Sequence, residues 1–312
     1  MIEDSKITAT SSPFAIREGE IKIFDGKDGY VSMNQIIQKV NLGHINELHF
    51  KILELVNEFE FITSRQLCQI LDWKNIEYKS QDKLNNKLDQ MVRSKILTRY
   101  YFSSEDGKGI YRIYCLEKMG KYLLDSRGIE TNWQASDNTK PVAMIKKRLA
   151  GNQVILAYLR KVKAFDEYTV KPAIKAKSLG KIFKATGGSV KLTKNGKSIS
   201  FLFEVVRREE DWQKKIIDKM NFYKDFYTNY VSGDSGFGTM PQLIIICEDE
   251  RHMVETFREI KIKNMEIEQI RLYYSTDLRQ NKEKLEDTLV EFKMDEETKK
   301  YVMRNVNLKL LD

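Results

Sequence analysis

The sequence predicts an α+β domain followed by an α/β domain with a mixed sheet. Up to about residue 128, helical patterns lead into two strand-like runs, whereas beyond residue 141 strands and helices alternate. A chain of 312 residues is long enough for two domains. We place a flexible N-terminal arm with one candidate strand at 21–24 over residues 1–28, the first domain at 29–128, a linker at 129–141 and the second domain at 142–312.

Helical patterns fill most of the first domain. A short helix is expected over residues 31–40, and a stripe of apolar residues at helical spacing between Ile45 and Val56 predicts a supporting helix. Thr63 and Ser64 offer capping hydroxyls to a further helix. A longer helix begins near Ser80, and its buried face is marked by Leu84, Leu88, Met91 and Val92.

Two strand-like runs follow, at residues 96–102 and 110–115. The Asp-Gly pair and the second glycine between them favour a hairpin loop. Helix, turn, helix and hairpin in this order are the parts of a winged helix-turn-helix. The first domain is therefore predicted to have this fold, and another helix is expected at 116–126.

The exposed face of the helix that begins near Ser80 carries cations and amides at steps of three and four. Such side chains bind phosphates, and Asn, Gln and Arg also read base edges. An ordinary solvated helix face is the alternative interpretation. The predicted DNA contacts on this helix and on the hairpin are Lys83, Asn86, Lys87, Gln90, Arg93, Arg99, Lys108 and Arg112.

Composition limits the class of protein. The net charge of +8 and the isoelectric point of about 9.1 favour a polyanionic partner, and double-stranded DNA is the expected one. We expect a cytoplasmic protein without membrane contact, because no apolar run approaches the roughly 20 residues of a membrane span and the N-terminus lacks a secretory signal. Three scattered cysteines, Cys68, Cys115 and Cys247, predict core positions and neither a disulfide framework nor a zinc site.

The second domain begins with a basic helix at 142–162, in which Lys146 and Lys147 are further candidate DNA contacts. An Asn-Gly pair at 195–196 predicts a hairpin between two of the strands that follow. The remaining predicted elements are strands at 168–172, 189–193, 198–206, 243–247 and 270–274, and helices at 209–230, 251–262 and 278–292.

Glu204 lies within an otherwise apolar strand, where a carboxylate is costly unless it is paired or holds a metal. Acidic residues that include Glu209 and Asp211 follow it at the start of the next helix. A hard cation such as Mg²⁺ or Mn²⁺, bound by Glu204, Glu209 and Asp211, is one interpretation. In the other, Glu204 pairs with a lysine or faces solvent, and the later acids only favour the helix N-terminus.

The strand 201–207, the helix with Lys219, Tyr223 and Tyr227, and the strand 243–247 resemble the replication-relaxation family of plasmid and mobile-element proteins. The resemblance extends to MobC-class relaxases, whose C-terminal domain is similar to restriction endonucleases, and it covers about residues 45–274. It implies a restriction-endonuclease-like second domain that acts at an origin of transfer or replication. Relaxosome or replication proteins are the implied partners, and a homodimer is possible.

Such nucleases bind metal through a Pro-Asp pair on one strand and a Glu-x-Lys on the next. Glu204 matches the glutamate, but Val206 occupies the lysine position and residues 186–188, Thr-Gly-Gly, occupy the Pro-Asp position. The resemblance therefore leaves two alternatives. Either Lys219 or Lys215 replaces the lysine and catalysis with Mg²⁺ or Mn²⁺ is retained, or the domain keeps the fold without the reaction.

The expected function is sequence-specific DNA binding at such an origin. The rival is a metal-dependent nickase or relaxase that uses Glu204, and a third alternative is a transcriptional regulator whose second domain dimerises or senses a ligand. Relaxase chemistry based on a histidine cluster is excluded, because His44, His49 and His252 do not have the spacing of such a cluster.

Overall fold

The computed structural model describes residues 12–103, 111–131, 133–282 and 284–306, and the chain divides into two compact units. The N-terminal unit comprises residues 17–149, and the C-terminal unit comprises residues from 150 onward together with the N-terminal residues up to Ile16. The boundary falls inside helix α6 (Val142–Lys161). Within the described ranges, no helix has the length and the apolar character needed to cross a membrane.

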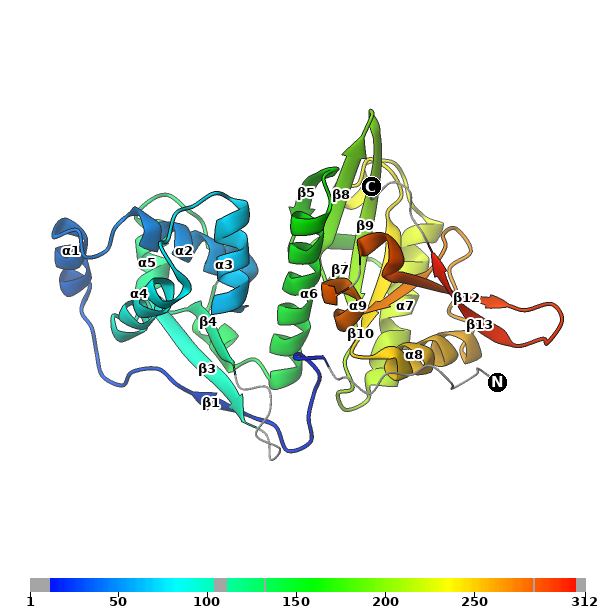
Figure 1. Ribbon diagram of the computed structural model, residues 1–312, viewed down its shortest axis with the longest axis horizontal. Coiled ribbons are helices and arrows are strands. Elements are labelled where there is room, and N and C mark those ends of the chain that lie inside the picture. Colours follow the sequence, from blue (N-terminus) through cyan, green and yellow to red (C-terminus); the bar gives the residue numbers. More distant parts are fainter. Residues whose placement is uncertain (1–11, 104–110, 132, 283, 307–312) are drawn as a thin grey trace. The chain divides into compact units, whose positions relative to one another are not determined.

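The N-terminal unit combines helices with a small antiparallel sheet of order β1-β3-β4-β2 (Figure 1). Its strands are β1 (Ile21–Phe24), β2 (Ile62–Thr63), β3 (Leu97–Ser103) and β4 (Arg112–Leu116). Its helices are α1 (Met33–Asn41), α2 (Glu47–Phe59), α3 (Ser64–Trp73), α4 (Gln81–Arg93) and α5 (Lys118–Asp125), followed by the 3₁₀ turn η1 (Ala135–Thr139).

Local sequence explains why α3 and α4 form where they were predicted. Thr63 caps α3 by accepting a hydrogen bond from the Gln66 backbone, and the Gln66 side chain accepts one from the Thr63 N–H. Ser80 caps α4 by accepting a hydrogen bond from the Lys83 backbone. The apolar stripe of α4 is buried, as expected: Leu84, Leu88, Met91 and Val92.

Parts of the predicted arm and linker have definite structure. The candidate strand at 21–24 is confirmed as β1, which pairs antiparallel with β3. Residues 12, 14 and 15 are buried in the C-terminal unit. In the predicted linker, the Asn138 amide donates a hydrogen bond to the Leu116 carbonyl at 3.0 Å. Tertiary contacts hold both segments in place. The polar sequence of each segment does not reveal these contacts.

The C-terminal unit is built on a seven-stranded mixed sheet of order β13-β12-β11-β10-β9-β8-β5 (Figure 1). Strands β9, β10 and β11 are parallel, and the other pairs are antiparallel. The strands are β5 (Phe165–Thr169), β8 (Ser189–Lys194), β9 (Lys197–Val205), β10 (Gln242–Cys247), β11 (Tyr273–Thr276), β12 (Leu289–Met294) and β13 (Tyr301–Val306).

Helices pack against both faces of this sheet. Tyr158 of α6 contacts Phe201 and Phe203 of β9 on one face. Helices α7 (Trp212–Thr228) and α8 (Glu250–Ile262) bury their apolar residues in a cluster with Leu202, Leu243 and other residues of the sheet. The alternation of Phe203, Glu204 and Val205 along β9 therefore directs the Glu204 side chain toward the α7 side.

The predicted hairpin of β8 and β9 is confirmed. Lys194 pairs with Lys197, and the two residues between them, Asn195 and Gly196, have φ angles of 51° and 74°. Positive φ at both central positions is what a two-residue hairpin turn needs, and Asn-Gly adopts it readily. The three cysteines are free and buried, as predicted.

The predicted helix at 278–292 is wrong. A short helix α9 (Asp277–Lys282) and the 3₁₀ turn η3 (Leu285–Asp287) precede β12, which pairs with β13 over six positions. Apolar residues at 289, 290 and 292 suit a strand as well as a helix, and pairing with β11 and β13 decides the outcome. The hairpin of β6 (Ala173–Ala176) and β7 (Lys181–Lys184) was not predicted either.

Candidate functional site

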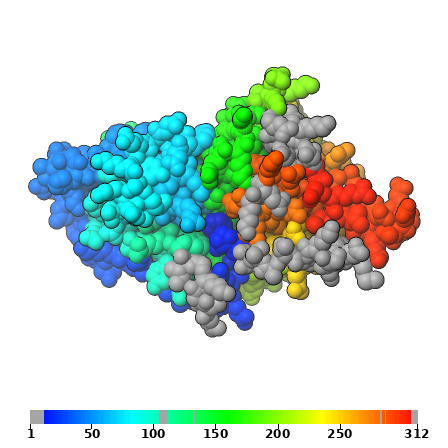
Figure 2. Space-filling model, viewed as in Figure 1, coloured from blue at the N-terminus to red at the C-terminus, as the bar shows by residue number. Residues whose placement is uncertain are grey.

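The exposed row on α4 is the first candidate site. Lys83, Asn86, Gln90 and Arg93 are exposed and Lys87 is half-buried, whereas the apolar stripe of the helix is buried. Arg93 pairs with Asp89 of the same helix at 2.7 Å. On the face shown in Figure 2, the cyan atoms of this part of the chain lie at the surface. The five side chains are therefore placed where a large ligand can reach them.

The two arginines predicted on the hairpin lie in different surroundings. Arg99 is buried and pairs with Asp25 at 2.9 Å and with Asp89 at 3.1 Å. These carboxylates raise the pKa of Arg99, although burial works against them. Arg112 is exposed and lies 3.2 Å from Asp25. Arg99 of β3 therefore holds α4 and the residue that follows β1 in place, and of the two arginines only Arg112 presents its guanidinium at the surface.

Three other predicted DNA contacts are on other parts of the chain. Lys146 is buried, and its ammonium group donates to the Glu20 carboxylate at 2.6 Å. Because Lys146 is buried in this ion pair, it has a structural role, and the prediction that it contacts DNA at the surface is wrong. Lys147 is half-buried. Lys108 lies outside the described residues.

Glu204 is buried on β9 and is surrounded by polar groups (3% of its surface is exposed). Its carboxylate accepts hydrogen bonds from the Tyr223 hydroxyl at 2.7 Å and from the Thr186 hydroxyl at 2.9 Å. The Lys219 ammonium lies 3.8 Å away. Burial, and then the charge of Glu204, raise the pKa of Tyr223. These contacts supply the pairing that a carboxylate needs inside a protein.

The other proposed metal ligands face different partners. Glu209 pairs with Lys215 at 3.0 Å, and Lys215 also donates to the Glu210 carbonyl at 2.9 Å. Asp211 precedes α7 in the left-handed conformation, with φ of 56°, and is exposed. Among the described residues, no three His, Cys, Asp or Glu side chains gather as metal ligands. Lys219 is thus the one predicted lysine that the structure places beside Glu204.

A second buried cluster, which sequence reasoning missed, lies where β9, β10 and β11 end. Arg207 and Asp277, 0% and 1% exposed, pair at 2.6 Å. Buried Glu248 accepts hydrogen bonds from the backbone N–H groups of Ile16 and Arg208, both at 3.1 Å. Burial raises the pKa of Glu248. The available signal was that Arg207 and Glu248 each follow an apolar strand within two positions, at the edge of a parallel sheet where ligands commonly bind.

The N-terminal segment covers this cluster. The Ser12 hydroxyl donates to the Asp277 carboxylate, and Ser12, Phe14 and Ala15 are buried. The Ile16 N–H bond to Glu248 continues the same contact. In this structure the carboxyl edge of β9, β10 and β11 is therefore closed by the chain itself.

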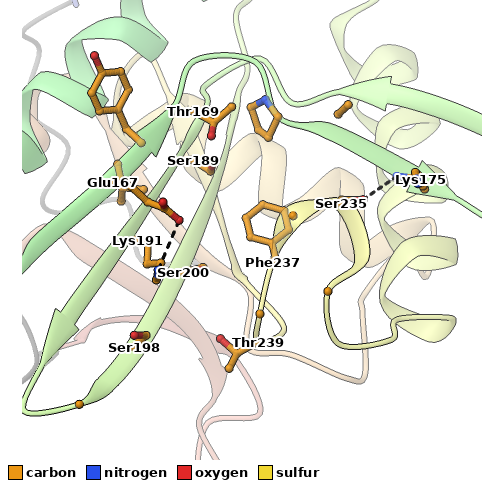
Figure 3. Close-up of a pocket in the computed structure, with 18 residues that line it drawn as sticks. Glu167, Thr169, Lys175, Ser189, Lys191, Ser198, Ser200, Ser235, Phe237 and Thr239 are labelled. Carbon is orange, nitrogen blue, oxygen red and sulfur yellow. Dashed lines mark hydrogen bonds and ion pairs between the residues drawn. The ribbon is translucent and has the colours of Figure 1, made fainter.

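Figure 3 shows a pocket of about 780 Å³ beside the hairpin of β8 and β9. Serine and threonine hydroxyls line it, and the Ser235 hydroxyl accepts a hydrogen bond from the Lys175 N–H at 3.1 Å. The glycine-rich loop at 233–238 is closed by a hydrogen bond from the Gly233 N–H to the Phe237 carbonyl at 2.8 Å. Lys191 is paired with Asp166 at 3.1 Å, which reduces the positive charge of the wall.

Comparison with known proteins gives no match: no family model, no curated protein and no solved structure is significantly similar to this chain.

Proposed function

We propose that the protein binds double-stranded DNA sequence-specifically through α4. The observation that carries the proposal is a row of exposed or half-buried cations and amides on a helix that follows α3 and precedes the β3–β4 pair: Lys83, Asn86, Lys87, Gln90 and Arg93. Lysine and arginine of such a row bind phosphates, and asparagine, glutamine and arginine form paired hydrogen bonds with base edges. In this proposal the N-terminal unit is a winged helix-turn-helix.

The electrostatics of the chain support this choice of partner. A net charge of +8 favours a polyanion, and Arg112 adds an exposed cation on β4. Each phosphate contact releases counterions, so affinity for DNA falls steeply as salt rises. A row that combines cations with amides is better suited to reading a sequence than a row of lysines alone, because the amides discriminate between bases.

The biological setting rests on the resemblance to replication-relaxation proteins. We place the protein at an origin of transfer or replication of a plasmid or other mobile element, with relaxosome or replication proteins as partners. The C-terminal unit is then a restriction-endonuclease-like domain, and its mixed sheet with helices on both faces is compatible with that assignment.

A second candidate function is metal-dependent nicking of DNA by the C-terminal unit. The observation in its favour is the position of Lys219 beside Glu204, with Thr186 from the Pro-Asp position bonded to the same carboxylate. Mg²⁺ or Mn²⁺ would be the metal, held by Glu204 with Glu209 or Asp211. The bonds that Glu204 makes to Tyr223 and Thr186 favour a structural role for this residue, so we place nicking second.

One experiment separates the two functions. Purified protein is incubated with supercoiled DNA that carries the flanking region of its own gene, with and without Mn²⁺. The proposal predicts a protected footprint on DNA that stays supercoiled in both conditions. A nick at one position that depends on Mn²⁺ and is lost in Glu204→Ala would instead establish the nickase. DNA that is neither protected nor cut would contradict both functions.

A further inference from the structure

The N-terminal unit contains a pocket of about 440 Å³ that borders the proposed DNA-contacting helix. Helix α1 contributes Lys39, the segment between α1 and α2 contributes His44 and Ile45, and α2 contributes His49. Gln90, Met91 and Arg93 of α4, with Ser94 and Ile96 beyond it, complete the lining. All of these residues belong to one unit, so the pocket is part of a single folded body.

The pocket has an apolar base. Ile45, Met91 and Ile96 line it, and each is at least 95% buried. A volume of this size is within the range of about 300 to 1,000 Å³ typical of small-molecule sites, which are mostly apolar with a few polar groups. The base therefore suits a small ring or a short aliphatic group.

The polar groups of the lining are cationic or able to donate hydrogen bonds. Lys39 donates to the Ser94 hydroxyl at 2.7 Å, which holds its ammonium group at the pocket. Arg93, 68% exposed, and the exposed His44 provide further donors. Among the described residues that line the pocket, none is acidic. An anionic group entering it would meet Lys39 and Arg93, and the carboxylate nearest to these cations is that of Asp89, which pairs with Arg93 from outside the lining.

We propose that this pocket binds a small organic anion, with an apolar body on Ile45, Met91 and Ile96 and a phosphate or carboxylate group at Lys39, His44 and Arg93. Two residues of the lining, Gln90 and Arg93, also belong to the row proposed to contact DNA. A bound anion competes with DNA for these side chains and weakens DNA binding. This regulatory consequence rests on the proposed function, whereas occupation of the pocket does not.

Histidine NMR gives a direct test, because the tag-free chain has three histidines, of which His44 and His49 line the pocket. His252 belongs to the other unit and serves as the internal reference. The probe is phenyl phosphate, which combines a ring with a phosphate, and phenol is the uncharged control. We expect saturable shifts of the His44 and His49 signals with phenyl phosphate, no shift of His252, and no comparable effect of phenol.

Variants identify the contacts. Lys39→Ala should weaken phenyl phosphate binding about tenfold, the effect of losing roughly one charge-assisted hydrogen bond. Lys51→Ala, which removes a partly exposed lysine of α2 that pairs with Glu54 and does not line the pocket, should leave the dissociation constant unchanged. Equal weakening by both variants, or equal shifts of all three histidines, would show non-specific attraction and overturn the proposal.

The probes also separate the sources of the anion. If inorganic phosphate binds as tightly as phenyl phosphate, the apolar base contributes nothing and the organic ligand is wrong. If DNA shifts His44 and His49 but phenyl phosphate does not, the pocket receives a backbone phosphate and the small-molecule site is overturned. Binding of phenyl phosphate by a protein that fails to bind DNA would support the pocket while contradicting the proposed function.

Discussion

In the N-terminal unit the cations and amides of α4 face solvent, whereas in the C-terminal unit the charges that follow β9, β10 and β11 are buried against one another. An exposed charge keeps its hydration and is free to meet a partner, and an exposed ion pair contributes only about 0 to 1 kcal/mol to stability. Breaking a buried pair costs much more, because it leaves an unpaired charge inside the protein. The comparison indicates that the second set serves the fold, whereas the first set is available for the binding that we propose.

The largest expected effect is on the buried pair. Arg207→Met should lower the free energy of unfolding by about 3 to 5 kcal/mol, since Asp277 is left buried without its cation. Urea unfolding measures this loss in the free energy of unfolding. Hydrogen exchange of peptides from β9, β10 and β11 reports on the local effect. The matched variant Arg251→Met breaks an exposed pair with Glu255 and should cost under about 1 kcal/mol. Equal costs would remove the distinction between buried and exposed charges.

Acid pH should act on the two units with opposite signs. Burial, and then the charge of Lys87, lowers the pKa of His49 from 6.5 to about 4. The unfolded chain therefore takes up this proton first, and the N-terminal unit loses stability as pH falls from 6.5 toward 4, by at most about 1.4 kcal/mol per pH unit. His49→Gln should remove this part of the pH dependence. An unchanged pH profile in the variant would show that His49 is not held in its neutral form.

Glu248 should give the stability of the C-terminal unit the opposite pH dependence. Burial raises its pKa above 4.5, so the folded C-terminal unit binds this proton more tightly than the unfolded chain does. Its stability falls as pH rises from 4.5 through the raised pKa, and Glu248→Gln should flatten that fall. Unfolding midpoints of wild type and variant, compared between pH 4 and pH 7, provide the measurement. A steeper fall of stability with pH in the variant would contradict the raised pKa of Glu248.

The smallest contrast lies within the N-terminal sheet. Arg99→Ala should destabilise this unit by about 1 to 3 kcal/mol, because Asp25 and Asp89 lose a largely buried cation. Arg112→Ala, at an exposed position, should change stability by under about 0.5 kcal/mol. If Arg112 contacts the DNA backbone, its loss should reduce the salt dependence of DNA binding by about one phosphate contact. A large stability loss in Arg112→Ala would contradict this division.

Sequence patterns predicted the elements whose stabilising contacts are local. The capping residue Thr63, the apolar stripe of α4 and the Asn195-Gly196 turn each specify their structure within a few residues. Pairing with other strands was not predictable in this way, as β12 shows, since it lies between β11 and β13 in the sheet. The candidate site residues also fall into these two groups, those placed by local sequence and those placed by contacts with distant residues. The exposed face of α4 followed from helical spacing, but the burial of Arg99 and Lys146 depends on the distant residues Asp25 and Glu20.

The central claim is that α4 contacts DNA, and fluorescence anisotropy with a DNA fragment from the flanking region of the gene tests it directly. The double variant Lys87→Ala/Gln90→Ala should weaken specific binding by about 10- to 100-fold, since base contacts are worth about 1 to 3 kcal/mol each. Gln213→Ala/Lys214→Ala removes the same residue types from exposed positions of α7 and should have no effect. Unchanged affinity of the α4 variant, or equal loss in both variants, would contradict the claim.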